Sequence, residues 1–330
     1  MGCYGECELG RPTKIAFRDL LLALKRGATR FLGAKPAHRR AESLEPASAG
    51  PARYDPLRRL VLTDEVSRTL FAEFAEHCLT ERGREETGWV LLGLRNVDEA
   101  IALATLPAGV KRDAGGSHVR FNPTAQGFAS RVVRQGNKRL TILGVVHTHP
   151  GSMRHPSDGD YRGDIAWVPN LRGEEGVFGI GTVDAQKHSP GDVSWQPAAN
   201  VQCLGELCWS WYSLQSGDRA YRPLPVEVSI GPDLALGLRP VWEELENHAE
   251  RLDRLARQVS RARFDVVEGK TKPALALTIP LPEADRSIRV LMEGKEVRYL
   301  LLGPDGAMMA DFRDDRVDHG VFVMLADLSS

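Results

Sequence analysis

Apolar residues between positions 58 and 230 follow helix and strand periods in turn. Apolar residues at helical spacing predict a helix over Asp64–Leu79, with Thr63 as its N-cap. Pro123 starts a second predicted helix, which runs to about Gln135. Short apolar runs between polar turns predict strands at Leu60–Leu62, Trp89–Leu94, Ala100–Leu106, Ser117–Phe121, Thr141–His147, Val177–Val183, Val193–Trp195, Leu207–Leu214 and Tyr221–Val226. This alternation predicts a mixed α/β unit.

A second pattern begins near Leu238. Apolar residues recur along one face of a charged segment, which predicts a helix over Pro240–Phe264. After it, apolar runs predict strands at Ala274–Pro280, Ile288–Met292, Val297–Leu302, Met309–Phe312 and Val321–Leu325. The sequence Gly-Pro-Asp-Gly from Gly303 is typical of a turn between two of them. We predict a small α+β module without a catalytic cluster.

Charge is distributed unevenly along the chain. Residues 1–60 hold 12 Lys/Arg and 6 Asp/Glu, a balance of +6, so the total of −1 leaves −7 for the remaining 270 residues. Helical spacing with basic faces predicts a helix over Ala16–Leu32, and the Pro-, Ala- and Ser-rich segment Lys35–Arg53 is typical of a linker. We therefore predict a basic N-terminal helix and linker over 1–54, an α/β domain over 55–230 and an accessory α+β module over 235–330.

Composition excludes several classes of protein. A near-zero net charge on 330 residues argues against a protein that coats nucleic acid, because such proteins carry a cationic excess. The sequence has no run of 18 apolar residues that could span a membrane, and its first ten residues lack the apolar core of a secretion signal. Five cysteines are a sparse, odd number that suits a reducing compartment. We expect a cytoplasmic globular protein that binds neither membrane nor nucleic acid.

Candidate chemistry is concentrated in residues 144–164. His147 and His149 are two residues apart on an extended segment, so their imidazoles point the same way and can reach one metal ion. Asp160 can add a carboxylate, and two histidines with one carboxylate are a common zinc set that leaves a position for water. Zinc lowers the pKa of that water, but hydrolysis also needs a general base and an oxyanion donor. Ser157 is a candidate donor, and the base must come from elsewhere in the chain.

The spacing of these residues resembles a known motif. From His147 to Asp160 the sequence follows H-x-H-P-x6-S-x2-D, which is similar to the JAMM motif of the MPN/JAB (Mov34) metalloprotease family. That family has a glutamate upstream, before a glycine and an apolar strand, and here Glu86 precedes Thr87 and Gly88 in that context. The resemblance covers roughly residues 58–228.

The resemblance implies a fold and a role for each matched residue. The fold would be an MPN/JAB-like mixed sheet with flanking helices, similar to cytidine deaminases. His147, His149 and Asp160 would bind zinc (Zn²⁺). Glu86 would take a proton from the zinc-bound water and pass it to the leaving amine. Ser157 would position the water or stabilise the oxyanion.

The resemblance also implies a substrate class. Members of the family commonly cleave isopeptide or peptide bonds after the C-terminus of ubiquitin or ubiquitin-like proteins. Bacterial members are often encoded with ubiquitin-like conjugation enzymes, some of them in antiviral defence. We therefore expect a zinc-dependent, deubiquitinase-like isopeptidase whose partners are a ubiquitin-like protein and its conjugates, with conjugation enzymes as further candidates.

Two other functions remain open at this stage. One is a non-catalytic MPN scaffold, which a measurement of bound zinc would separate from an enzyme. The other is a DNA-repair-associated protein of the RadC kind, which shares the histidine, serine and aspartate spacing. The Glu86 context and the acidic body favour the peptidase, whereas strongly salt-dependent binding of nucleic acid would favour the RadC-like protein.

Other residues in and around the motif have ordinary interpretations. The segment Leu106–His118, Gly-rich and basic, is either a substrate-facing flap or a mobile loop. We expect that deleting 235–330 weakens recognition and leaves zinc binding intact. The remaining interpretations are surface positions for Glu85, His155, Asp158 and Asp164, a packed position for Trp89, and plain thiols at Cys203 and Cys208.

Overall fold

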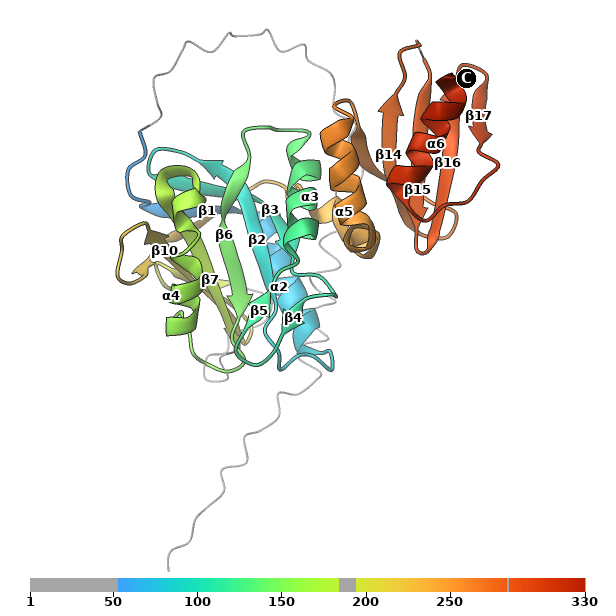
Figure 1. Cartoon of the computed structure of the whole chain (residues 1–330). Helices are drawn as coiled ribbons and strands as arrows, with labels where there is room; N and C mark the ends of the chain where they lie inside the picture. Colours follow the sequence, from blue (N-terminus) through green and yellow to red (C-terminus); the bar gives the residue numbers. More distant parts are fainter. Residues whose placement is uncertain (1–52, 184–193, 284, 330) are drawn as a thin grey trace, which may run out of the picture.

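The structure is a computed structural model that describes residues 53–183, 194–283 and 285–329 (Figure 1). The helix predicted over Ala16–Leu32 and most of the predicted linker lie outside the described residues. Within the described residues, two large sheets account for most of the strands, and they are joined through one helix.

The first sheet is mixed and curled. Its strand order is β12-β1-β3-β2-β6-β7-β10-β9-β8, and β11 pairs with β10 outside this path. Pairing is parallel for β6 with β7 and for β1 with β3 and β12, and antiparallel elsewhere. The strands are β1 (Arg59–Thr63), β2 (Gly88–Arg95), β3 (Glu99–Pro107), β6 (Thr141–Thr148), β7 (Glu175–Val183), β8 (Trp195–Ala198), β9 (Val201–Leu204), β10 (Leu207–Gln215), β11 (Arg222–Pro223) and β12 (Val226–Ser229).

Helices cover both faces of this sheet. Alternate residues of a central strand point to opposite faces, so one strand contributes to a core on each side. On β2, Trp89 and Leu91 share a core with helix α2 (Asp64–Cys78). Val90 and Leu92 share another core with helix α3 (Pro123–Arg134). These positions confirm the predicted mixed α/β fold with flanking helices, and they confirm that Trp89 is packed.

Short elements complete the first unit. Helix α4 (Asp158–Asp164) lies beside β7 and β10 (Figure 1). Strands β4 (Asp113–Ala114) and β5 (Val119–Arg120) pair as a small hairpin within and just after the predicted flap segment. Short 3₁₀ helices lie at Val168–Asn170 and Arg172–Glu174, and another, at Leu236–Val241, leads into the second unit.

The second sheet is antiparallel and separate, with the order β13-β14-β15-β16-β17. Its strands are β13 (Arg263–Glu268), β14 (Pro273–Pro280), β15 (Ser287–Glu293), β16 (Glu296–Gly303) and β17 (Gly306–Met309), and its helices are α5 (Trp242–Gln258) and α6 (Val317–Ser329). The turn predicted from Gly303 joins β16 to β17.

Three predictions for this unit are wrong. The strand predicted over Met309–Phe312 lies three residues earlier as β17, because the tight turn pairs Gly306 with Gly303, and only Met309 belongs to both. The long helix ends at Gln258, and Phe264 lies on β13, where pairing with β14 supplies its backbone hydrogen bonds. The segment Val321–Leu325 is helical and lies within α6. Its residues are all apolar, so periodicity could not distinguish a strand from a helix.

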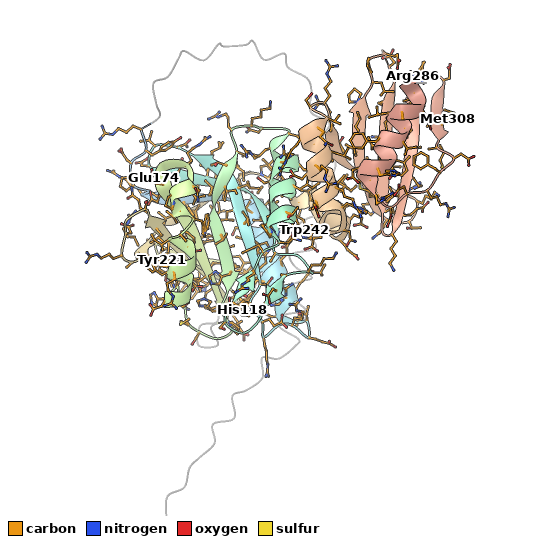
Figure 2. The ribbon with its side chains drawn as sticks, in the orientation of Figure 1. His118, Glu174, Tyr221, Trp242, Arg286 and Met308 are labelled. Atoms are coloured by element: carbon orange, nitrogen blue, oxygen red, sulfur yellow. The ribbon has the colours of Figure 1, made fainter. Side chains whose placement is uncertain are left out.

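One hydrophobic core extends across the two units. Phe128 of α3 packs edge-on against Phe264, with ring centroids 4.8 Å apart. Trp242, labelled in Figure 2, and Leu252 of α5 belong to the same buried cluster. Deleting residues 235–330 would expose this core, so we expect the truncated chain to lose stability and not only recognition.

No helix among the described residues is long and apolar enough to cross a membrane.

Candidate metal centre

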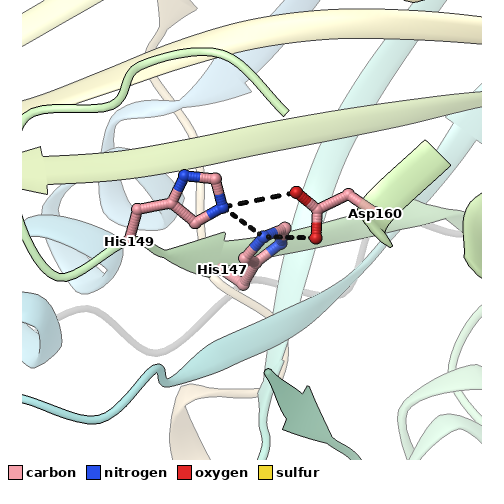
Figure 3. A group of neighbouring side chains, drawn as sticks. All are labelled: His147, His149 and Asp160. Carbon is pink, nitrogen blue, oxygen red and sulfur yellow. Dashed lines mark hydrogen bonds and ion pairs between the residues drawn. The ribbon is translucent and has the colours of Figure 1, made fainter. Parts of the chain in front are cut away.

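The two motif histidines lie together at the end of a central strand. His147 is on β6, and the backbone N–H of His149 continues the ladder by donating to the Gly181 carbonyl of β7 at 2.8 Å. Their Nε2 atoms are 3.0 Å apart, and both side chains are buried (Figure 3). The predicted convergence of residues two apart is therefore present.

Asp160 reaches the same point from helix α4. Its two carboxylate oxygens lie 3.2 Å from Nε2 of His147 and 3.4 Å from Nε2 of His149 (Figure 3). The ligand atoms of all three residues lie within 4.8 Å of one another. Burial would raise the pKa of Asp160, but hydrogen bonds from the two histidines hold it well below its usual range.

The orientation of His149 suits metal binding. Its Nδ1 lies 3.0 Å from the Met153 carbonyl, which can only accept, so Nδ1 carries the hydrogen and Nε2 is left to face Asp160. Burial lowers the pKa of His149, but the hydrogen bonds with Asp160 and the Met153 carbonyl and the nearby carboxylate charges together raise it above its usual value. Two imidazole nitrogens and one carboxylate facing one point form a ligand set that fits zinc.

Glu86 lies beside these three residues and is almost fully buried, with 5% of its surface exposed. It is close enough to interact electrostatically with both histidines and with Asp160. Burial raises its pKa, and the histidines oppose that rise. The neighbouring Glu85 is paired with Arg82 at 2.6 Å nearer the surface, which supports choosing Glu86 from the sequence.

The backbone around Glu86 is fixed from two sides. Its N–H donates to the Gly115 carbonyl of the β4–β5 hairpin at 2.7 Å, and Thr148 donates its N–H to the Thr87 carbonyl at 2.8 Å. Gly88 follows at a close approach of strands, where a Cβ atom would lie 2.7 Å from the Val146 carbonyl oxygen. The small residue after the Glu-Thr pair is therefore required by packing against β6.

Ser157 is the N-cap of α4 and orients Asp160. The Asp160 N–H donates to Ser157 Oγ at 3.1 Å, and the Ser157 N–H donates to Asp160 Oδ2 at 2.6 Å, which together form a capping box. These two bonds fix the Asp160 carboxylate in an orientation in which both of its oxygens face the histidines. Accepting this bond does not use the Ser157 O–H, which can still donate.

One protein-family model matches part of this chain. Residues 67–197 match the profile of the family described as prokaryotic homologs of the JAB domain. This part of the chain is a prokaryotic JAB domain. The solution structure of protein DSY2949 from Desulfitobacterium hafniense is similar, with 17% identity, a TM-score of 0.36, and coverage of 52% of this chain and 94% of that one. No curated protein matches the sequence.

No residue of helix α4 in the JAB domain is fully buried. Hydrogen bonds from tyrosine hydroxyl groups hold the helix in place. Tyr221 donates from its hydroxyl to Asp164 at 2.8 Å, and Tyr161 donates to the Asp218 carbonyl at 2.9 Å. Trp167 also donates to Asp164, at 3.2 Å. The prediction that Asp164 is an exposed helix residue is wrong, because Asp164 is half-buried against these partners, and this burial raises its pKa to about 6.

The loop between His149 and Ser157 is here called the metal loop. Sequence reasoning missed the residues that hold it in the JAB domain. The Tyr212 hydroxyl lies 3.0 Å from His155 Nδ1 and donates to the Arg154 carbonyl at 2.9 Å, and Tyr212 lies on β10, far along the chain. Asp164 could have been found, because it lies four residues after Asp160 and therefore on the same helix face. His155 and Asp158 are exposed, as predicted.

Proposed function

We propose that this chain is a zinc-dependent isopeptidase or peptidase that cleaves after the C-terminus of a ubiquitin-like protein. The observation that carries the proposal is the convergence of His147, His149 and Asp160 on one point, with the buried Glu86 beside it. Metal-assisted hydrolysis needs three ligands and a carboxylate base beside them. A non-catalytic scaffold has no need for this arrangement.

Each residue then has a defined task. A zinc ion held by His147, His149 and Asp160 supplies Lewis acidity, which lowers the pKa of water and polarises a carbonyl. Glu86 accepts the proton of the attacking water and returns it to the leaving amine, and its raised pKa suits a group that must both take and give a proton. The Ser157 O–H donates to the oxygen of the attacked carbonyl as negative charge develops there.

The substrate and partners belong to the same proposal. The β4–β5 hairpin is hydrogen-bonded to the backbone of Glu86, so a peptide that reaches this glutamate passes the hairpin. A tail that ends in Gly-Gly fits such a site because it carries no side chains. We propose residues 55–230 as the catalytic domain, 235–330 as an accessory module, and a cytoplasmic location beside ubiquitin-like conjugation enzymes.

The test uses the full-length, zinc-loaded protein and fusions of ubiquitin, or of a ubiquitin-like protein encoded beside it, to a reporter after Gly-Gly. We expect cleavage at that bond, abolished by a chelator and restored by zinc. Glu86→Gln should lower the rate by about 10²–10⁴-fold while zinc stays bound. Glu85→Gln is the matched control and should leave the rate unchanged. Cleavage that survives Glu86→Gln or chelation, or no cleavage of any fusion, would overturn the proposal.

A further inference from the structure

Two cysteines face each other across the β9–β10 hairpin. The strands are joined by the two residues Gly205 and Glu206, and Gly205 has φ +60°, as the first central residue of a type II′ turn requires. The turn makes the flanking pair, Leu204 with Leu207, hydrogen-bonded. Because paired types alternate along an antiparallel ladder, the next pair, Cys203 with Cys208, is not hydrogen-bonded.

A hydrogen bond further along the ladder confirms this alternation. Trp211 donates its N–H to the Asn200 carbonyl at 2.8 Å, so this pair, three positions beyond the cysteines, is of the hydrogen-bonded type. Residues of a non-hydrogen-bonded pair have Cα atoms about 4.5 Å apart and side chains on the same face. That separation lies within the range of about 4.4–6.8 Å that a disulfide spans. Cys203 and Cys208 can therefore be joined without moving the strands.

One of the two sulfur atoms lies beside a cation. Arg154 donates from Nη2 to Cys208 Sγ at 3.4 Å. A guanidinium next to a thiol stabilises the thiolate, which is the form that reacts with oxidants. Cys78 differs, because burial raises the pKa of its thiol to about 11. The chemistry therefore favours Cys208 as the thiol that reacts first.

Arg154 also belongs to the loop that orients a metal ligand. The preceding residue, Met153, supplies the carbonyl 3.0 Å from Nδ1 of His149, and the Arg154 carbonyl accepts from the Tyr212 hydroxyl at 2.9 Å. The guanidinium contact with Cys208 thus anchors to β10 the segment that fixes the His149 ring. A change at the Cys208 sulfur therefore acts on one of the contacts that hold this segment to β10.

We propose that Cys203 and Cys208 are an oxidisable pair that hydrogen peroxide closes into a cross-strand disulfide, and that this closure releases Arg154 and weakens the hold on the metal. The second part rests on the proposed function. The side chains are buried, with 0% and 1% of their surface exposed, so the oxidant must be as small as a peroxide. Larger disulfide reagents such as oxidised glutathione should react much more slowly.

The oxidation proceeds in two balanced steps. The Cys208 thiolate attacks one peroxide oxygen, the O–O bond breaks, and hydroxide leaves, which forms a sulfenic acid. The Cys203 sulfur then attacks the Cys208 sulfur, the S–O bond breaks, and the leaving hydroxide takes the Cys203 proton as water. Two thiols are oxidised, one peroxide is reduced to two waters, and a thiol reductant reverses the bond.

The first readout needs no metal. Full-length protein is treated with hydrogen peroxide, denatured, alkylated and digested, and the peptide that carries both cysteines is weighed. We expect it to be two hydrogens lighter, to take no alkylating reagent, and to return to two thiols after reduction, while Cys78 stays alkylatable. In Cys203→Ala the reaction should stop at a sulfenic acid on Cys208 that dimedone traps. If both thiols stay alkylatable, or if Cys78 oxidises as fast, the pair is not an oxidisable site.

The second readout tests the link to the metal loop. The zinc dissociation constant of the wild type should rise about tenfold on oxidation, as for loss of a supporting contact around a metal ligand, and recover on reduction. Cys208→Ser keeps an acceptor for Arg154 but cannot oxidise, so its zinc affinity should not respond to peroxide. An unchanged affinity in the oxidised wild type would overturn the link. A failure of the proposed function would already be visible in the reduced protein, as absent cleavage.

Discussion

The hydroxyl of Tyr221 donates a 2.8 Å hydrogen bond to the carboxylate of Asp164, one helical turn beyond Asp160. No residue of helix α4 is fully buried, and this bond is one of the contacts that fix its position, together with the packing of Tyr161. Asp160 can meet the two histidines only if α4 stays where it is. Tyr221 is therefore a positioning residue for the metal centre, although it touches none of the three ligands.

Tyr221→Phe should weaken zinc binding about tenfold, because it removes the bond to α4 and keeps the aromatic ring. The dissociation constant can be measured by competition with a chromogenic chelator. Tyr299→Phe is a matched control, since Tyr299 donates to the Asp314 carbonyl at 2.9 Å in the other sheet. Equal zinc affinities for Tyr221→Phe and the wild type would show that the bond does not position Asp160.

Asp164 should make stability depend on pH in a defined direction. Burial raises its pKa from 3.8 to about 6, so the folded state holds the proton more tightly than the unfolded chain. The stability that this group contributes is present below about pH 4 and lost as pH rises to about 6. Asp164→Asn cannot titrate. As the pH rises from 4.5 to 7, its free energy of unfolding should therefore increase relative to that of the wild type, by at most about 3 kcal/mol.

Urea unfolding of the zinc-free proteins at several pH values measures this difference. The zinc-free form is needed because a cation bound near Asp160 would also change the pKa of the Asp164 carboxyl group. If the unfolding free energies of the two proteins change in parallel across this pH range, the assignment of a half-buried Asp164 with a raised pKa is contradicted.

The shared core predicts that the two sheets unfold together. Leu252 of α5 is fully buried in the cluster that also contains Phe128 of α3. Leu252→Ala should lower the free energy of unfolding by about 2–4 kcal/mol in a single transition. Glu250→Ala, at an exposed position of the same helix, should change it by less than about 0.5 kcal/mol. Two separate transitions, with only one of them shifted by Leu252→Ala, would show that the units are independent.

The candidate metal ligands could be picked out from the sequence because their spacing is local. His147 and His149 are two residues apart on a strand, and Asp160 follows a serine cap by three, so period and capping rules place them. Glu86 is distant in sequence, and it was found only through the resemblance of its surroundings to a known motif. The sheet of the first unit was also predictable, because its strands are short apolar runs between turns.

The supporting contacts were not predictable in the same way. Tyr221 meets Asp164, and Arg154 meets Cys208, through tertiary packing that links positions more than 50 residues apart. Cys203 and Cys208 lack the spacing of a metal site, and their pairing depends on a tight turn at Gly205. In the second unit, Val321–Leu325 is apolar at every position, so packing against the sheet and not periodicity decides that it is helical.

The measurement that tests the account most directly is the zinc content of the full-length protein after zinc loading and exhaustive dialysis. We predict about one zinc ion per chain for the wild type and for His319→Ala, an exposed histidine of helix α6 outside the ligand set. The double variant His147→Ala/His149→Ala should retain none. A wild type that retains no more zinc than this double variant would contradict the central claim that these side chains form a metal centre.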